Sequence, residues 1–107
     1  MPFYELRRYY ILPGKMDEWI EFFEQVILPF QVGKGMVVSG IYRGEDDDSC
    51  FVWTRRFEDE ADRERLYAAV YEDPAWKNEI GPKIPDMMDR SKIQVTRLTP
   101  SPKSVAQ

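Results

Sequence analysis

The sequence contains no histidine at all. Without an imidazole side chain the protein cannot build a His-ligated haem site, a Cys/His zinc site, a Ser-His-Asp triad or a Cys-His dyad. Any catalysis would have to use carboxylates, Lys, Arg, Tyr, Trp or a bound cofactor. We expect no metal and no cofactor.

Cysteine and long apolar runs are almost as scarce. Cys50 is the only cysteine, which excludes an internal disulfide and suits a reducing compartment. No apolar run approaches the roughly 20 residues that a membrane span requires, and Met1–Glu5 is typical of a strand rather than a signal peptide. We therefore expect a cytoplasmic protein that does not use a membrane.

The composition is that of one small domain. The chain has 107 residues, 43% of them hydrophobic, and a formal net charge of −4 at pH 7. This length allows one modest core. A mildly acidic balance argues against nucleic acid or an anionic membrane as the main partner.

The hydrophobic pattern predicts six main elements. Steps of three and four between apolar residues indicate helices, and alternating residues indicate strands. The expected elements are a strand over 3–11, a helix over 15–31, strands over 36–43 and 50–57, a helix that begins at 58–60, and a strand over 91–98, with a short helical turn at 73–80 before the last strand.

This order is that of the ferredoxin-like βαββαβ arrangement, an α+β fold. It predicts a four-stranded antiparallel sheet whose first and third strands are central. Right-handed crossovers place both main helices on one face and leave the other face bare. We expect the domain to cover residues 1–98 and residues 99–107 to form a flexible tail.

The first strand carries a carboxylate, a guanidinium and a phenol on a single face, because Glu5, Arg7 and Tyr9 are two residues apart. Placing two charges under apolar helices is costly, which predicts Leu6 on the helix side. The bare face would then carry a set of aromatic and charged residues: Phe3, Glu5, Arg7, Tyr9, Phe51, Trp53, Arg55 and Phe57. So much exposed aromatic surface predicts either a second copy of the chain or a flat ligand packed against it.

Five of these residues are candidates for ligand binding. Arg7 offers a planar fork for a carboxylate, phosphate or enolate oxygen, and its alternative role is a charge pair with Glu5 or with a carboxylate of a partner chain. Glu5 is either a general base or, with better support, a salt-bridge partner. Tyr9 supplies a hydroxyl group and Trp53 a flat wall, while Arg55 faces either the same cavity or solvent. No catalytic residue is assigned.

Two other sites are considered and disfavoured. RNA-recognition domains share this fold and stack bases on strand aromatics, but the segment Ser49–Trp53 lacks the glycine and the basic residue of their motif. The acidic run Glu45–Asp48 invites a calcium site. Counted from Asp46, however, the positions for the required Gly and Glu hold Phe51 and Phe57.

An ordered series of motifs resembles the NIPSNAP family over residues 3–98. The motifs are Tyr4–Tyr9, Pro13–Lys15, Ile27–Pro29, Gly40–Tyr42, Val52–Trp53, Arg63 with Arg65, and Asp73–Trp76. The resemblance implies a dimeric α+β barrel, in which two sheets face each other around a cavity. It implies little about activity, and relatives in the wider superfamily that use histidine cannot serve as guides.

We therefore expect a homodimer, formed through the open sheet face, that binds a small anionic or aromatic metabolite in the barrel cavity. One alternative is a non-catalytic dimeric module for protein interaction. Another is a cofactor-independent enzyme that resembles a monooxygenase or an isomerase.

Overall fold

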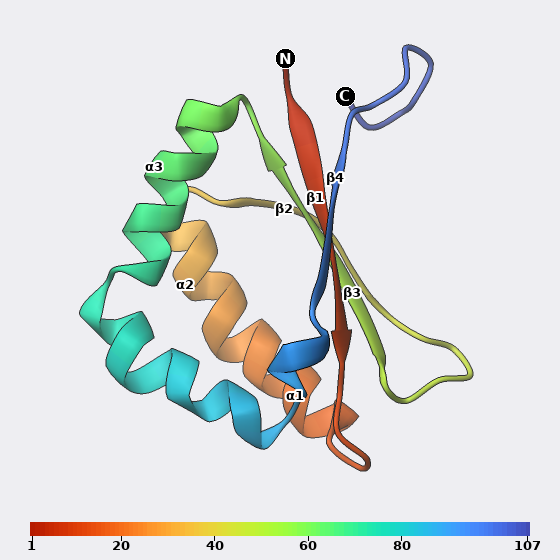
Figure 1. The fold of residues 1–107 in the computed structure, drawn as a ribbon, viewed down its shortest axis with the longest axis vertical. Helices are drawn as coiled ribbons and strands as arrows, with labels where there is room; N and C mark the ends of the chain where they lie inside the picture. Colours follow the sequence, from red (N-terminus) through yellow and green to blue (C-terminus); the bar gives the residue numbers. More distant parts are fainter.

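A computed structural model describes residues 1–107 as one antiparallel sheet with helices on one side (Figure 1). The strands are β1 (Phe3–Tyr10), β2 (Val37–Arg43), β3 (Cys50–Phe57) and β4 (Gln94–Leu98), in the order β2-β3-β1-β4. The first and third strands are central, as expected. The structure confirms the ferredoxin-like α+β fold.

The first helical rod joins α1 (Met16–Phe22), η1 (Phe23–Ile27) and α2 (Leu28–Gly33), close to the predicted helix over 15–31. The middle segment η1 is a wider π-helical turn that ends two residues before Pro29. A proline in a helix lacks a backbone N–H donor and crowds the carbonyl group four residues before it. A widened turn at this point relieves both effects.

The second helical arm begins with α3 (Glu60–Tyr71), which is capped by the Asp59 side chain accepting from the Asp62 N–H at 2.7 Å. The chain continues through η2 (Trp76–Ile80), η3 (Gly81–Asp86) and η4 (Arg90–Lys92). The last strand was expected from residue 91 but begins at Gln94, because η4 takes up the residues before it. None of the helices has both the length and the apolar character needed to cross a membrane.

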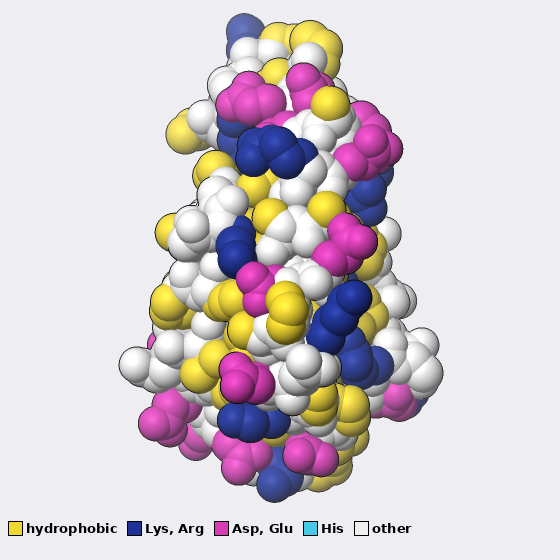
Figure 2. Space-filling model, turned by 90° about the vertical axis from the view of Figure 1, so that its left-hand side faces the viewer, with side chains coloured by type: hydrophobic (Ala, Val, Ile, Leu, Met, Phe, Trp, Pro, Cys, Tyr) yellow, Lys and Arg dark blue, Asp and Glu magenta, His cyan; other side chains and the backbone are white.

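The outward surface of the helical layer mixes acidic, basic and apolar side chains without a large area of one sign (Figure 2). Its inward surface supplies buried residues to the core, among them Trp19, Phe23, Ile27, Leu66 and Val70. This division places the hydrophobic core between the helices and the sheet.

The expected assignment of the two sheet faces is wrong. In the antiparallel pair of β1 and β3, Glu5 lies opposite Arg55 and Arg7 opposite Trp53, so these side chains share one face. That face lies under the helices, where Trp53 is 1% exposed and Arg55 0% exposed. Leu6, expected on the helix side, lies half-buried on the open face.

The aromatic residues explain this orientation. Phe51, Trp53 and Phe57 are each at most 1% exposed, and burying one large aromatic side chain removes about 150–250 Å² from water. The cost of burying Glu5 is offset because Arg55 stands directly across the strand pair, 2.9 Å away. Hence aromatic burial decides the face, and the two charges neutralise each other.

The open face is more polar than expected. It carries Tyr42, which is 60% exposed and lies opposite Val52. Residues 99–107 turn back onto this face, where the Gln107 carbonyl oxygen accepts from Tyr4 Oη at 3.2 Å and from Arg56 Nε at 2.6 Å. The flexibility of this segment stays a prediction.

Candidate functional site

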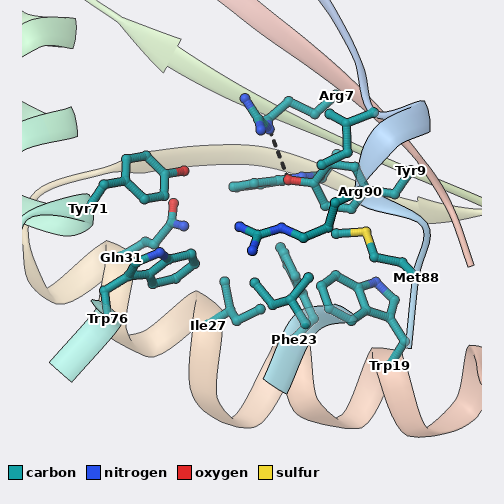
Figure 3. A pocket seen from close by; sticks show the side chains of 13 residues that line it. Arg7, Tyr9, Trp19, Phe23, Ile27, Gln31, Tyr71, Trp76, Met88 and Arg90 are labelled. Atoms are coloured by element: carbon teal, nitrogen blue, oxygen red, sulfur yellow. Dashed lines mark hydrogen bonds between the residues drawn. The ribbon is translucent and has the colours of Figure 1, made fainter. Parts of the chain in front are cut away.

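A cavity of about 50 Å³ lies between the covered sheet face and the helices (Figure 3). Thirteen residues line it, ten of them hydrophobic, and they come from two central strands and both helical arms. All three tryptophans of the chain, Trp19, Trp53 and Trp76, belong to this lining. The cavity is therefore within one chain, whereas we had expected it between the sheets of two chains.

Arg7 brings a positive charge to this cavity from β1. Its Nε donates to Tyr9 Oη at 2.9 Å, and its Nη1 donates to Tyr67 Oη at 3.4 Å. No carboxylate lies within ion-pair distance of its guanidinium group. Burial acts to lower the pKa of Arg7, but the hydroxyl oxygens of Tyr9 and Tyr71 outweigh it and raise the pKa. Arg7 is thus a permanent, half-buried cation held by phenols alone.

Arg90, from η4, is a second guanidinium group at the same cavity. It lines the cavity and is also exposed, which places it at the mouth. Figure 3 shows its side chain extending toward Gln31, Tyr71 and Trp76. Its guanidinium group has no hydrogen-bond or ion-pair partner in the chain. The lining therefore holds two cations and no carboxylate.

The other polar groups of the lining add further donors. The indole N–H groups of Trp19 and Trp53 are buried and have no acceptor in the chain. The Gln31 amide oxygen accepts from Arg55 at 3.0 Å, which leaves the amide N–H₂ group as its free end. A lining rich in donors and poor in acceptors suits a ligand that carries acceptor oxygens.

Beside the cavity lies a group that we call the Glu5 cluster, consisting of Glu5, Arg55, Arg63 and Tyr67. The Glu5 carboxylate accepts from Arg55 Nη2 and Arg63 Nε, both at 2.9 Å, and from Tyr67 Oη at 2.8 Å. Burial acts to raise the pKa of Glu5, but the hydrogen bond from Arg63 and the charge of Arg55 hold it below its ordinary value. Glu5 is thus a buried carboxylate that remains ionised.

Tyr67 connects the Glu5 cluster to the cavity. Its hydroxyl proton goes to Glu5, and its oxygen accepts from Arg55 Nη2 at 3.0 Å and from Arg7 at 3.4 Å. Burial and the nearby Glu5 charge raise the pKa of Tyr67, which keeps the phenol neutral. Tyr67 therefore helps to fix the position of Arg7 without neutralising it.

The structure brings three of the five candidate residues to the cavity. Arg7, Tyr9 and Trp53 line it, whereas Glu5 and Arg55 pair with each other outside the lining. That any of them contacts a ligand stays a prediction.

Sequence reasoning missed three lining residues that carry polar groups, namely Gln31, Tyr71 and Arg90. The spacing of the first helix placed Gln31 four residues after Ile27, on the buried side. Nothing in the irregular segment before β4 signalled Arg90. Trp19 and Trp76, interpreted as core, are buried and also line the cavity.

The lining offers limited chemistry. It contains no carboxylate and no lysine, so none of its side chains is an obvious general base. No three side chains among the Asp, Glu and Cys residues are grouped so that they could hold a metal ion. The charged groups of the lining are the two guanidinium groups of Arg7 and Arg90.

Solved structures of similar fold include several proteins of one family. A NIPSNAP family protein from Agrobacterium tumefaciens is 19% identical over the whole of both chains, with a TM-score of 0.89. Another from the same organism, described as of unknown function, is 22% identical over 99% of this chain and 94% of that one, with a TM-score of 0.89. An uncharacterised NIPSNAP-like domain protein from Burkholderia xenovorans is 23% identical over 96% of this chain and 88% of that one, with a TM-score of 0.85.

At these identities the likeness shows the fold alone. No curated protein matches the chain. The sequence itself carries the family assignment, because the NIPSNAP family model matches residues 4–102. The chain belongs to the NIPSNAP family.

Proposed function

We propose that this NIPSNAP protein binds a small anionic metabolite in the cavity between its sheet and its helices, with Arg7 as the anchor. One observation carries the proposal: Arg7 is a half-buried cation, and the cavity that it lines contains no carboxylate. A buried charge is costly unless it is paired. An anionic ligand would supply the missing partner.

The charges under the helices support this proposal. Arg55 and Arg63 both bind the Glu5 carboxylate, so that carboxylate is already fully used. Arg7 has only phenol oxygens as acceptors. A guanidinium group presents several N–H donors in a plane, which fits the two oxygens of a carboxylate or the oxygens of a phosphate.

The expected ligand is small. A cavity of about 50 Å³ is well below the roughly 300–1,000 Å³ of sites for drug-sized molecules. Two aromatic walls, Trp53 and Trp76, border it, so an unsaturated ligand would find flat surfaces to pack on. Stabilisation of an anion would serve simple binding, and it would equally serve an isomerase-like or oxygenase-like reaction through an enolate.

The test is a thermal-shift screen of the purified chain against small carboxylates, phosphates and their neutral analogues. A ligand that binds only the folded state raises Tm. The variant Arg7→Met should lose the shifts. Arg8→Met is the matched control, because it removes the same charge from the other face of the same strand. Equal shifts for Arg7→Met and the unmodified chain would contradict the proposal.

We further propose that two copies pair through the open sheet face. Tyr42 is 60% exposed there and Val37 is 49% exposed, so this face offers apolar surface to a second copy. The aromatic stripe that first motivated a dimer is covered by helices, so the case now rests on these residues and on the family resemblance. Tyr42→Glu should give a monomer in size-exclusion chromatography with light scattering. Val26→Glu, on the helical surface, should not.

A further inference from the structure

We propose that Arg90 is the second half of a clamp that, together with Arg7, closes on a short carboxylate with an apolar body. This inference rests on the proposed function and assigns its ligand class and a specificity-determining residue. Arg7 and Arg90 line the same cavity from opposite ends of the chain, one on β1 and one on η4. They are the only charged residues of the lining.

The first argument is the state of the Arg90 side chain. Arg90 is exposed, yet it borders the cavity, and its guanidinium group bonds to nothing in the chain. Most other arginines of the chain form ion pairs with carboxylates, as seen for Arg43, Arg56, Arg65 and Arg97. A cation that stands unpaired at the mouth of a cavity is placed to meet an anion that enters.

The second argument comes from Lys92, which lies two residues further along the same short helix. Its Nζ lies 5.9 Å from the centre of the Tyr10 ring, on the open face of the sheet, and it does not line the cavity. The turn η4 thus sends one cation to the cavity and another away from it. Lys92 is therefore a natural control of equal charge.

The third argument is the shape and polarity of the space. The cavity has room for roughly three to five non-hydrogen atoms, at about 10–15 Å³ for each water-sized centre. Its hydrophobic residues, such as Ile27, Phe23 and Ile84, offer no hydrogen bonds to the far end of a ligand. A ligand with a carboxylate bound by the two guanidinium groups and a short apolar chain packed against these residues fits both the charged and the apolar part of the cavity. A phosphate, with acceptor oxygens on all sides, would leave several of them against apolar walls.

The experiment uses the tryptophans as reporters, because all three line the cavity. The full chain is titrated with propionate, with the neutral propionamide of nearly the same shape, and with inorganic phosphate, at constant ionic strength. Propionate should change the fluorescence in a saturable manner and propionamide should not. Arg90→Gln should weaken propionate binding by roughly tenfold, the usual worth of a hydrogen bond to a charged group. Lys92→Gln should change it by less than about twofold, because exposed charges are screened by salt.

Several results would overturn the clamp. They are equal responses to propionamide and propionate, a stronger response to phosphate, no response to propionate, or equal weakening by Arg90→Gln and Lys92→Gln. Circular dichroism of Arg90→Gln should match the unmodified chain, since the side chain has no partner to lose. The clamp can fail while the proposed function survives. If Arg7→Met abolishes binding while Arg90→Gln does not, Arg90 has no part in the site but the cavity still binds an anion.

Discussion

Two arginines under the same helices have opposite surroundings. Arg55 is 0% exposed, and its terminal nitrogens donate to Glu5, Gln31, Tyr67 and Tyr71. Arg7 lies on the neighbouring strand. It donates to two phenol oxygens, pairs with no carboxylate and lines the cavity.

This difference distinguishes a residue that stabilises the fold from a residue that is available to bind a ligand. Glu5 neutralises the charge of Arg55, and both terminal nitrogens of Arg55 are engaged, although its Nε has no acceptor. A charge that already has a counter-charge has little capacity left for an anionic ligand, whereas a charge without one retains it. The Glu5 cluster is therefore expected to matter for stability, and the Arg7 cavity for binding. Substitutions in the two regions should have effects of different kinds.

The largest effect on stability is expected from Glu5→Ala. It would leave Arg55 buried without a counter-charge, which typically costs about 3–5 kcal/mol. The measurement is urea unfolding of the variant and the unmodified chain. Glu58→Ala is the matched control, because Glu58 pairs with Arg56 at 2.6 Å on the surface and should cost less than about 1 kcal/mol. Equal costs for the two variants would mean that the Glu5 cluster does not stabilise the fold.

A smaller loss is expected from Tyr67→Phe, about 1–3 kcal/mol, because the change removes a buried hydroxyl group that donates to Glu5 and accepts from Arg55. Since Tyr67 also accepts from Arg7, this variant should weaken any propionate binding while Arg7 itself is intact. Fluorescence titration beside urea unfolding measures both. Loss of stability with unchanged binding would show that Tyr67 does not position Arg7.

Much of this comparison was visible in the sequence. The alternation of β1 and β3 put Glu5, Arg7, Tyr9, Trp53 and Arg55 on one face, and the structure keeps them together. The position of the first helix followed from its apolar spacing, and the strand order followed from the βαββαβ order of the elements.

The sequence did not show which face is covered. The covered face depends on the register of β1 and β3. Glu5 lies directly opposite Arg55, so their charges cancel, and the burial of the aromatic residues then favours placing this face under the helices. If the cost of burying each charged residue is counted separately, the wrong face of the sheet is predicted to be buried. Arg90 was missed for a different reason, since it lies in a turn of three residues, which is too short to show a periodic pattern.

The loss of stability at acidic pH should also distinguish the Glu5 cluster from the Arg7 cavity. The pKa of Glu5 in the folded chain lies below its ordinary value of 4.5. As the pH falls, Glu5 is therefore protonated in the unfolded chain before it is protonated in the folded chain. The contribution of Glu5 is therefore complete above pH 4.5 and is lost as the pH falls through the lowered pKa. Urea unfolding of Glu5→Gln should show a flatter decline than the unmodified chain in this range. Parallel declines would mean that Glu5 has the same pKa in both states.

The smallest effect on stability is expected from Arg7→Met. Arg7 has no ion pair to lose, and a methionine of similar length would fill the same space without a buried charge, so the free energy of unfolding should change by less than about 1 kcal/mol. Arg55→Met is the matched control and should cost several times more, because Glu5 then keeps only Arg63 as a cation. Yet Arg7→Met, the milder of the two for the fold, should be the one that abolishes propionate binding. If it instead unfolds the chain as readily as Arg55→Met, then Arg7 is part of the structural network and the cavity is not a site.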